Sequence, residues 1–337
     1  MKAVAYRRAL PIEHADSLID IELPEPVPDG RDLLVQVQAV SVNPVDTKVR
    51  ANVDPMGEAR VLGWDAAGTV VAVGPDVTLF KAGDPVYYAG ALDRPGSNSE
   101  LHRVDERIVG RKPQSLSFAQ AAALPLTSIT AWELLFDRLS VRFGKPAGAG
   151  TLLVVGGAGG VGSIAIQLAR RLTGLTVIAS ASTPASREWT LAMGAHHVVD
   201  HGRPLAGQVK ALASGGADYV LGLTHTEQHF DEIAEALAPQ GKVAVIDDPK
   251  KPPNILALKT KSASFHWEFM FTRPRYQTAD MIAQHRLLDE VADLVDAGLL
   301  RTTFKQDLGV INAANLKRAH ALLESGRTTG KLVLSGF

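Results

Sequence analysis

The sequence predicts an α/β fold in which a doubly wound parallel sheet is joined to a second, mostly β domain. The chain has 337 residues, which is enough for two domains of ordinary size. Residues 1–125 are rich in β-branched residues, glycine and proline. From residue 151 onward, strand, turn and helix patterns alternate, and alternating units of this length are typical of parallel sheets.

The composition indicates a folded protein with a sizeable core, since 46% of the residues are hydrophobic and 21% are charged. A net charge of −1 argues against a nucleic acid or an anionic membrane surface as partner. No apolar run reaches the roughly 18 residues of a membrane span, and the N-terminus does not resemble a signal peptide. The absence of cysteine excludes disulfides, thiolate metal sites and a cysteine nucleophile, and it fits a cytoplasmic location.

The individual elements follow from local patterns. Alternation of apolar and polar residues between turn residues predicts early strands at 32–42, 66–74 and 84–90, followed by a helical segment at 121–139. The alternating region then gives strands at 151–157, 176–182, 196–201, 217–224, 241–248 and 262–271, with helices at 161–172, 186–195, 205–214 and 229–239. The tail reads as helices near 279–297 and 312–325 and a terminal strand at 330–337.

One turn in the alternating region has the pattern G-x-G-x-x-G, running from Gly157 through Gly159, Gly160 and Val161 to Gly162. It follows an expected strand and opens an expected helix. In that context the first glycine permits the tight turn, the second lets a pyrophosphate approach the backbone, and the third lets helix and strand pack closely. The helix N-terminus then offers unpaired N–H groups to the phosphates, so the turn predicts a dinucleotide site.

The end of the next strand favours NADP(H) over NAD(H). An NAD site usually has Asp or Glu there to hold the ribose 2′-hydroxyl, but this chain has Ser180 to Thr183 and no acid until Glu188. Hydroxyl groups and a nearby cation would accept a 2′-phosphate. Ser182 and Arg187 are therefore the expected ligands of that phosphate.

A set of motifs occurs in order along the chain: VNPVD (42–46), GWDAAGTVVAVG (63–74), FKAGDPVY (80–87), AALPLTSITAWE (122–133), GGAGGVG (156–162), LTHTEQHFDEIAEALAPQGKVAVIDDP (223–249), HWEFMFTR (266–273) and GRTTGKLVL (326–334). With these motifs the whole chain resembles the medium-chain dehydrogenase/reductase superfamily. Within it, the quinone oxidoreductase branch and the bacterial zinc-type alcohol dehydrogenase-like proteins are the most similar in pattern.

The resemblance implies a GroES-like substrate domain over residues 1–126, completed by residues 273–337. It also implies a Rossmann dinucleotide-binding domain over 127–272. A homodimer or homotetramer is implied as well, with the strand near 262–271 pairing across the interface. The apolar character of that strand is equally consistent with burial inside its own subunit.

Alcohol dehydrogenases of this superfamily hold a catalytic zinc, and this chain departs from their pattern at each expected ligand. Asn43, Trp64 and Leu126 stand at those positions, and none is an imidazole, thiolate or carboxylate donor. Asp46 and Asp65 remain nearby, but two carboxylates are too few. We therefore expect no zinc. Two histidine groups, at 196, 197 and 201 and at 225 and 229, lack the spacing of known metal sites and favour surface or capping roles.

Without a Lewis acid, interconversion of simple alcohols and ketones is harder, whereas a conjugated acceptor spreads the developing charge. The expected function is therefore NADPH-dependent reduction of quinones or α,β-unsaturated carbonyls, which makes a small-molecule quinone or enone the substrate. The resemblance places Asn43 near the reacting oxygen, and Asp46 is a candidate to orient a water or hydroxyl. The glycine turn and the strand end predict the cofactor contacts Gly157, Gly159, Gly160, Val161, Gly162, Ser182 and Arg187. The resemblance implies further cofactor contacts at Thr130, His201, Thr224, Asp247 and Lys331.

Two alternatives remain open. One is a zinc-type alcohol or aldehyde dehydrogenase, or a zinc-free alcohol or aldehyde reductase, which substrate profiling would identify. The other is a non-enzymatic protein that senses NADPH or binds RNA, although no basic patch with interleaved aromatic residues supports RNA binding. Tyr87 and Tyr88 could donate hydrogen bonds to a substrate, but a buried structural role on a strand is the commoner one.

Overall fold

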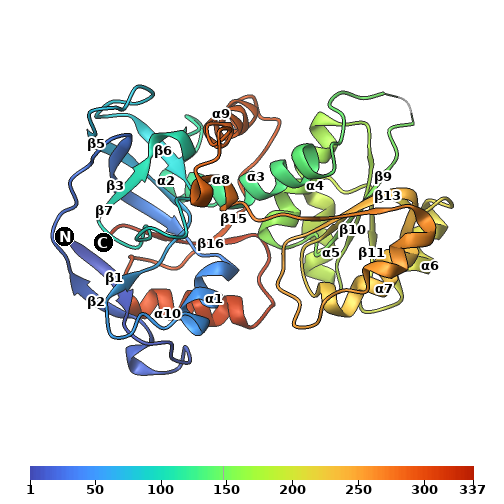
Figure 1. The fold of residues 1–337 in the computed structure, drawn as a ribbon, viewed down its shortest axis with the longest axis horizontal. Coiled ribbons are helices and arrows are strands. Elements are labelled where there is room, and N and C mark those ends of the chain that lie inside the picture. The colour runs from blue at the N-terminus through green and yellow to red at the C-terminus, as the bar shows by residue number, and fades with distance from the viewer. Residues whose placement is uncertain (147) are drawn as a thin grey trace. The chain divides into compact units, whose positions relative to one another are not determined.

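The computed structural model describes residues 1–146 and 148–337, and they form two compact units. Unit 1 comprises Met1–Ile129 and Phe271–Phe337, and unit 2 comprises Thr130–Met270. The expected domain boundaries differ from these by two or three residues. The α/β fold class is confirmed, and both chain termini lie in unit 1 (Figure 1).

Unit 2 contains a parallel sheet, and the glycine turn directly follows the first strand of this sheet in sequence. In the described part of this unit the sheet has six strands in the order β11-β10-β9-β12-β13-β14, and every pairing is parallel. This order reverses direction at β9, which places the carboxyl ends of β9 and β12 at the switch point where such sheets bind ligands. The strands are β9 (Thr151–Val155), β10 (Thr176–Ser180), β11 (His197–Val199), β12 (Ala217–Gly222), β13 (Leu237–Val245) and β14 (Ser264–Trp267).

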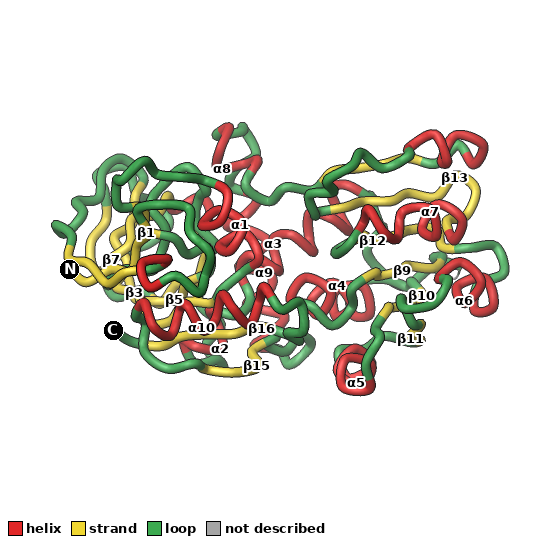
Figure 2. The backbone as a smooth tube through the Cα atoms, turned by 90° about the horizontal axis from the view of Figure 1, so that it is seen from below, coloured by secondary structure: helices red, strands yellow, loops and turns green. Residues whose placement is uncertain are grey.

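Helices connect these strands, as the alternating pattern predicts, and Figure 2 allows the alternation to be followed from β9 to β13. Two of them, α6 and α7, pack side by side, and their apolar residues form a core with Leu153 and Val155 of β9. The helical elements are α4 (Gly160–Leu172), α5 (Pro184–Ala192), α6 (Leu205–Leu212), α7 (Thr226–Ala236), a π-helix (Glu133–Arg138) and a 3₁₀ helix (Ile255–Lys261).

Unit 1 is built on two sheets. The larger has the order β15-β16-β3-β5-β6-β8, with β7 paired to β3, and the smaller has the order β2-β1-β4. Strand β16, near the end of the chain, pairs antiparallel with β3 and brings residues about 290 positions apart together. The strands are β1 (Lys2–Tyr6), β2 (Ile19–Glu22), β3 (Asp32–Ser41), β4 (Arg60–Val61), β5 (Ala66–Val73), β6 (Pro85–Tyr88), β7 (Leu101–Asp105), β8 (Val109–Arg111), β15 (Phe304–Asp307) and β16 (Lys331–Ser335).

Short helices complete unit 1, and α1 lies beside α10 although 260 residues separate them (Figure 1). The helices are α1 (Pro44–Asn52), α2 (Phe118–Ala122), α3 (Pro125–Trp132), α8 (Thr272–Tyr276), α9 (Ala283–Asp296) and α10 (Ala313–Glu324), with 3₁₀ turns at Ala15–Ser17 and Glu106–Ile108. The boundary with unit 2 falls within α3.

Two expected elements are shorter than their patterns suggested. The helical segment at 121–139 is interrupted before Pro125, because a residue preceding proline is disfavoured in the α conformation. The expected strand at 262–271 is ordered as β14 only from Ser264 to Trp267. Glu268 still donates its backbone N–H to Val245, but its side chain is bonded to Arg138 and the chain then turns into α8.

Candidate cofactor and active site

The glycine turn of unit 2 has the geometry of a phosphate cradle. Gly159 is the N-cap of α4, and it has no side chain with which to cap the helix. A Cβ on Gly162 would lie 2.5 Å from the carbonyl oxygen of Gly156, so the turn has room only for glycine there. A Cβ on Gly159 would meet nothing closer than 3.7 Å, which leaves the backbone open on that side. The first N–H groups of a helix have no partner within the helix, so an anion can approach them.

Ser180, at the end of β10, joins this turn to a histidine. Its carbonyl accepts the N–H of Gly157 at 3.0 Å, and its hydroxyl oxygen accepts the N–H of Gly156 at 3.0 Å. The same hydroxyl lies 3.1 Å from Nδ1 of His201, which follows β11. The sequence placed Ser180 at the strand end but did not single it out. Ser180 is 24 residues from Gly156 in sequence, so its position beside the glycine turn depends on the register of the sheet.

Ser182 and Arg187, the expected ligands of a 2′-phosphate, follow the same strand end. Ser182 is exposed just before α5. Arg187 lies in the first half of α5 and donates one N–H to the carbonyl of Val198 on β11, at 3.1 Å. A guanidinium has five N–H donors, so this single bond leaves it able to bind an anion. Their role in binding stays a prediction.

Thr224 and Asp247 lie after β12 and β13, at the same carboxyl edge as the glycine turn. The hydroxyl of Thr224 is 2.6 Å from Nδ1 of His225, and Asp247 accepts the N–H of Thr226 at 2.8 Å. The second carboxylate oxygen of Asp247 is buried and has no hydrogen-bond partner. An orphaned acceptor at this edge fits a ribose hydroxyl of a dinucleotide. Thr130, also expected at the cofactor, is buried on α3.

A buried charged centre lies in unit 1, where the pairing of β16 with β3 brings Lys331 beside Val42. The ammonium group of Lys331 donates to the carbonyl of Val42 at 3.0 Å, to a carboxylate oxygen of Asp65 at 2.8 Å, and to the amide oxygen of Asn43. An ammonium has three N–H donors, and all three are used here. Lys331 was expected to line the cofactor; in this structure its donors are occupied within unit 1, and a contact with the cofactor stays a prediction.

Asn43 is the hub of this centre. Its amide nitrogen donates to Asp65 at 2.9 Å and to the carbonyl of Trp64 at 3.1 Å. Its backbone N–H donates to Asp46 at 2.7 Å, which caps the first turn of α1. The expected contact of Asn43 with a reacting oxygen would therefore need one of these bonds to open.

Asp46, within this centre, is poised to change its charge near neutral pH. It is fully buried, and burial raises its pKa to about 7, although the N–H of Asn43 and the charge of Lys331 oppose that rise. One of its oxygens is buried without a hydrogen-bond partner. Burial also raises the pKa of Asp65, which Lys331 and the N–H of Leu126 counteract.

The three positions where the superfamily's zinc ligands would stand do come together in this structure. Asn43 bonds to Asp65, Leu126 donates its N–H to Asp65 at 2.7 Å, and Trp64 adjoins Asn43. The indole N–H of Trp64 donates to the carbonyl of Ala91, and its ring packs against Phe271. The side chains at the three positions are an amide, an indole and a leucine, which are not zinc donors, and the carboxylate of Asp65 that lies among them is paired with the ammonium of Lys331.

No cluster of three histidine or acidic side chains suited to a metal occurs within residues 1–146 and 148–337. Tyr87 and Tyr88 have the structural role that is common on strands: both are fully buried, and they bond to the carbonyl of Leu288 and to the ring of His102. In the same described part of the chain, no helix has both the length and the apolar character needed to span a membrane.

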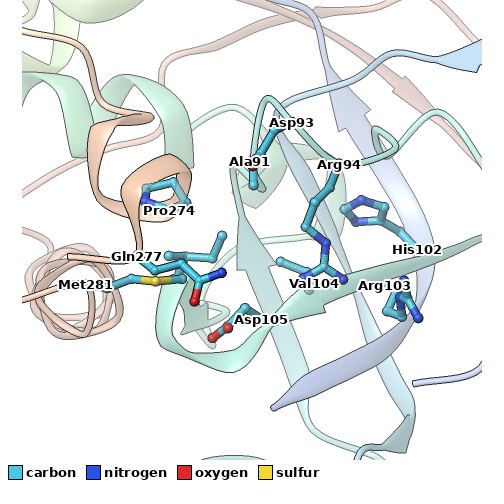
Figure 3. A pocket seen from close by; sticks show the side chains of 11 residues that line it. Ala91, Asp93, Arg94, His102, Arg103, Val104, Asp105, Pro274, Gln277 and Met281 are labelled. Atoms are coloured by element: carbon cyan, nitrogen blue, oxygen red, sulfur yellow. The ribbon is translucent and has the colours of Figure 1, made fainter. Parts of the chain in front are cut away.

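Figure 3 shows a small cavity of unit 1, with Arg94 and His102 on one side and Gln277 and Met281 on the other. Its volume of about 50 Å³ holds a few waters, at roughly 10–15 Å³ each, and is too small for a nicotinamide or a quinone. The side chains of Arg94 and His102 are already paired. Arg94 makes two bonds of 2.8 Å to Asp32, and burial lowers the pKa of His102 to about 4.

Two family models match the chain. One, described as the alcohol dehydrogenase GroES-like domain, matches residues 29–126, and the other, described as zinc-binding dehydrogenase, matches residues 193–334. The first falls in unit 1, and the second spans parts of both units.

Curated relatives match over most or nearly all of the chain. A zinc-type alcohol dehydrogenase-like protein of Staphylococcus aureus is 40% identical over 99% of this chain and 100% of its own length. The quinone oxidoreductase of Pseudomonas aeruginosa is 32% identical, over 91% of this chain and 92% of its own. A 2-methylene-furan-3-one reductase of Solanum lycopersicum is 36% identical, over 67% of each chain.

Solved structures share the fold. A protein from Rhizobium etli, described as a zinc-dependent alcohol dehydrogenase protein, is 58% identical with a TM-score of 0.96, covering 100% of this chain and 98% of its own. The Escherichia coli quinone oxidoreductase in complex with NADPH is 25% identical with a TM-score of 0.85, covering 99% and 100%. Agreement of this extent with both groups confirms the expected fold and kinship, and the chain is therefore an oxidoreductase of the medium-chain dehydrogenase/reductase superfamily, a member of its zinc-type alcohol dehydrogenase-like proteins.

Proposed function

We propose that this protein reduces quinones or α,β-unsaturated carbonyls with NADPH, by hydride transfer without a catalytic zinc. The observation that carries the proposal is the ammonium of Lys331, held by Asn43 and Asp65 among the three positions where zinc ligands would stand. A positive charge at that place repels a divalent cation, and the two carboxylates nearby, Asp65 and Asp46, are too few to hold a catalytic zinc.

The chemistry follows from what this centre offers. When bound, NADPH supplies a hydride, and the acceptor gains that hydride and one proton. A conjugated acceptor delocalises the negative charge that develops, so positioning contributes more than a Lewis acid does. Asp46 orients a water or hydroxyl toward the acceptor through its unpartnered oxygen, and its raised pKa suits proton exchange near neutral pH.

The chain's own groups hold the cofactor in this proposal. The first N–H groups of α4, from Gly160 to Gly162, bind the pyrophosphate, and Ser182 and Arg187 bind the 2′-phosphate. Asp247 and Thr224 face the ribose and base from the ends of their strands. The printed names of the relatives, which include quinone oxidoreductases, a complex with NADPH and a reductase of a methylene-furanone, support the acceptor class and the cofactor.

A homodimer or homotetramer is part of the proposal. Strand β14 pairs only with β13 on the path of the described sheet, so its other edge offers unpaired backbone groups. Trp267 on that strand is 53% exposed, and Phe269 just after it is 43% exposed, which favours pairing with a second copy.

The test is a substrate panel with purified protein, followed through NADPH oxidation at a fixed cofactor concentration. We expect quinones and enones to be turned over, simple alcohols and aldehydes to be slow, and activity to survive dialysis against a chelator. NADPH should bind at least about tenfold more tightly than NADH, which is about 1.4 kcal/mol.

Two outcomes contradict the proposal. Turnover of alcohols alone, with quinones inert and activity lost on chelation, would show a zinc-type alcohol dehydrogenase. Binding of NADPH without turnover of any acceptor, together with salt-dependent binding of RNA, would show a non-enzymatic role.

A further inference from the structure

Three histidines from different parts of the sequence meet at the carboxyl edge of the parallel sheet in unit 2. His201 follows β11, His225 is the N-cap of α7, and His229 lies one turn further along α7. The rings of His201 and His229 have their centroids 5.8 Å apart and are inclined by 59°. His225 has a φ of 49°, a left-handed conformation that non-glycine residues rarely adopt. We call these three residues the imidazole cluster.

The imidazole cluster has no ion-pair partner among the residues that the structure describes. Burial lowers the pKa of His201, and the neighbouring His225 adds to that effect while Asp200 opposes it. Burial also lowers the pKa of His229, followed by the charges of His201 and His225, against Asp247 and Glu232.

The acids that face the cluster are each engaged elsewhere. Asp200 accepts the N–H of Gly202 at 2.8 Å, and Glu232 accepts the N–H of Ala206 at 2.9 Å. Asp247 accepts the N–H of Thr226 through one oxygen. His201 and His229 are therefore half-buried imidazoles whose pKa is lowered chiefly by burial, and His225 lies exposed beside them.

The position of the cluster identifies the anion that it would meet. His201 lies 3.1 Å from the hydroxyl of Ser180, the last residue of β10, and this strand end is where dinucleotide-binding sheets hold the adenosine ribose. We propose that His201, His225 and His229 bind the 2′-phosphate of NADPH and take up a proton as it binds. The inference rests on the proposed cofactor and adds three specificity-determining residues to Ser182 and Arg187.

The physical reason is that binding of the phosphate and binding of protons to the imidazoles are linked. A phosphate monoester carries close to two negative charges above pH 7, and such a charge beside an imidazole favours the imidazolium form. The pKa values of His201 and His229 are lowered in the free protein, and the bound phosphate raises them, so protons bind with the phosphate at any pH between the free and bound values. Affinity for the 2′-phosphate then falls as the pH rises through the pKa of the complex.

The test uses two fragments of the cofactor and needs no turnover. Adenosine 2′,5′-bisphosphate and adenosine 5′-monophosphate are titrated by calorimetry between about pH 7 and 8.5, where the phosphate itself is already dianionic. Comparing two buffers with different ionisation enthalpies gives the number of protons taken up. We expect about half a proton or more with the bisphosphate, and little with the monophosphate.

Variants of the cluster residues test whether the proton uptake comes from these imidazoles. His229→Gln and His201→Gln keep a polar side chain but cannot become cationic, so each should weaken bisphosphate binding about fivefold or more and reduce the proton uptake. Binding of the monophosphate should not change. His197→Gln is the matched control, because His197 is exposed on β11 outside the cluster, and it should behave as wild type.

The outcomes separate this inference from the proposed function. A tighter bisphosphate complex with no proton uptake, unaffected by either cluster variant, would overturn the cluster while leaving the NADPH site in place. Failure of both fragments to bind would overturn the nucleotide site and the cluster with it.

Discussion

The two charged regions of the molecule differ in how completely their groups are paired. In unit 1, Lys331 uses all three donors, Asn43 uses both amide hydrogens, and Asp65 accepts from three neighbours. In unit 2, the start of α4 is uncapped, and Asp247 has an orphaned oxygen. The three imidazoles there form no ion pair within residues 1–146 and 148–337.

This difference separates a scaffold from a ligand site. Buried groups whose hydrogen bonds are all made, such as Lys331, Asn43 and Asp65, have nothing left with which to bind, so removing one of them leaves its partners unsatisfied and is costly to stability. An unsaturated, half-exposed edge costs little to alter in the free protein, but each alteration changes what it binds. Mutations in the two regions should therefore affect different measurements.

The largest effect is expected from Lys331→Met in unit 1. The variant leaves Asp65 and Asn43 buried without the ammonium, which should lower the free energy of unfolding by about 3–5 kcal/mol. Urea denaturation measures this loss. The double variant with Asp65→Asn should be less destabilised than Lys331→Met alone, since no uncompensated charge remains buried.

Lys2→Met is the matched control, because the side chain of Lys2 is 64% exposed and its nearest oxygen in Glu100 is 3.9 Å away. Its free energy of unfolding should change by about 0.5 kcal/mol or less. A cost below about 1 kcal/mol for Lys331→Met would mean that the centre is not a scaffold.

Two glycines of one turn give the next comparison. Gly162→Ala places a Cβ 2.5 Å from the carbonyl of Gly156, so it should destabilise the protein by about 1–3 kcal/mol. Gly159→Ala has a negative φ and no atom nearer than 3.7 Å, so its stability should change by about 1 kcal/mol or less. Its Cβ stands where a pyrophosphate approaches, and NADPH should bind about tenfold more weakly.

Fluorescence titration with NADPH and urea denaturation of both variants complete this test. Wild-type affinity in Gly159→Ala would show that no phosphate approaches the turn on that side.

Local patterns were sufficient to predict most of the fold. The alternation after residue 151 predicts β9 to β13 and their helices, and G-x-G-x-x-G predicts the turn at the start of α4. These signals work because a strand, a helix and a tight turn each depend on residues that are neighbours in sequence. The resemblance then supplied the order of the domains, which periodicity alone does not give.

The charged sites depend on contacts that no local pattern records. Lys331 and Asp65 are 266 positions apart, and His201 and His229 lie on separate elements. Nothing near Lys331 in sequence distinguishes a lysine buried against Asn43 from one that lines a cofactor. The register of β16 on β3 decides it, and pairing registers between distant strands become visible only in the folded chain.

A pair of buried carboxyl groups in unit 2 is only partly hydrogen-bonded. It is intermediate between the fully bonded groups around Lys331 and the unpaired edge of the parallel sheet. Glu133 and Glu268 are both buried, and Arg138, from the π-helix, donates to Glu268 at 2.6 Å. One oxygen of Glu268 nevertheless has no hydrogen-bond partner. Burial, followed by the neighbouring Glu133, raises the pKa of Glu268 to about 9. Glu268 is thus protonated when folded at neutral pH, whereas in the unfolded chain it ionises near its ordinary pKa of 4.5.

The raised pKa of Glu268 sets the direction of the smallest predicted effect on stability. The contribution of Glu268 to stability is fully present below pH 4.5 and is lost as the pH rises toward 9, because unfolding then releases its proton. Glu268→Gln removes that proton, so its stability relative to wild type should improve by about 1–2 kcal/mol between pH 5.5 and 8. The limit is roughly 1.4 kcal/mol per pH unit, and the 34% exposure of Arg138 reduces it through solvent screening.

Denaturation curves at several pH values test this, with Asp280→Asn as control. The side chain of Asp280 is 60% exposed, and its pKa is lowered by Thr278 and Arg273, so its contribution is lost only as the pH falls below its ordinary value of 3.8. That control should therefore run parallel to wild type over the whole range. If Glu268→Gln did so too, Glu268 would be ionised in the folded state at neutral pH. Arg138 would then pair with Glu268 as Lys331 pairs with Asp65, and Glu268 would belong with the paired groups rather than with the edge that we assign to the cofactor.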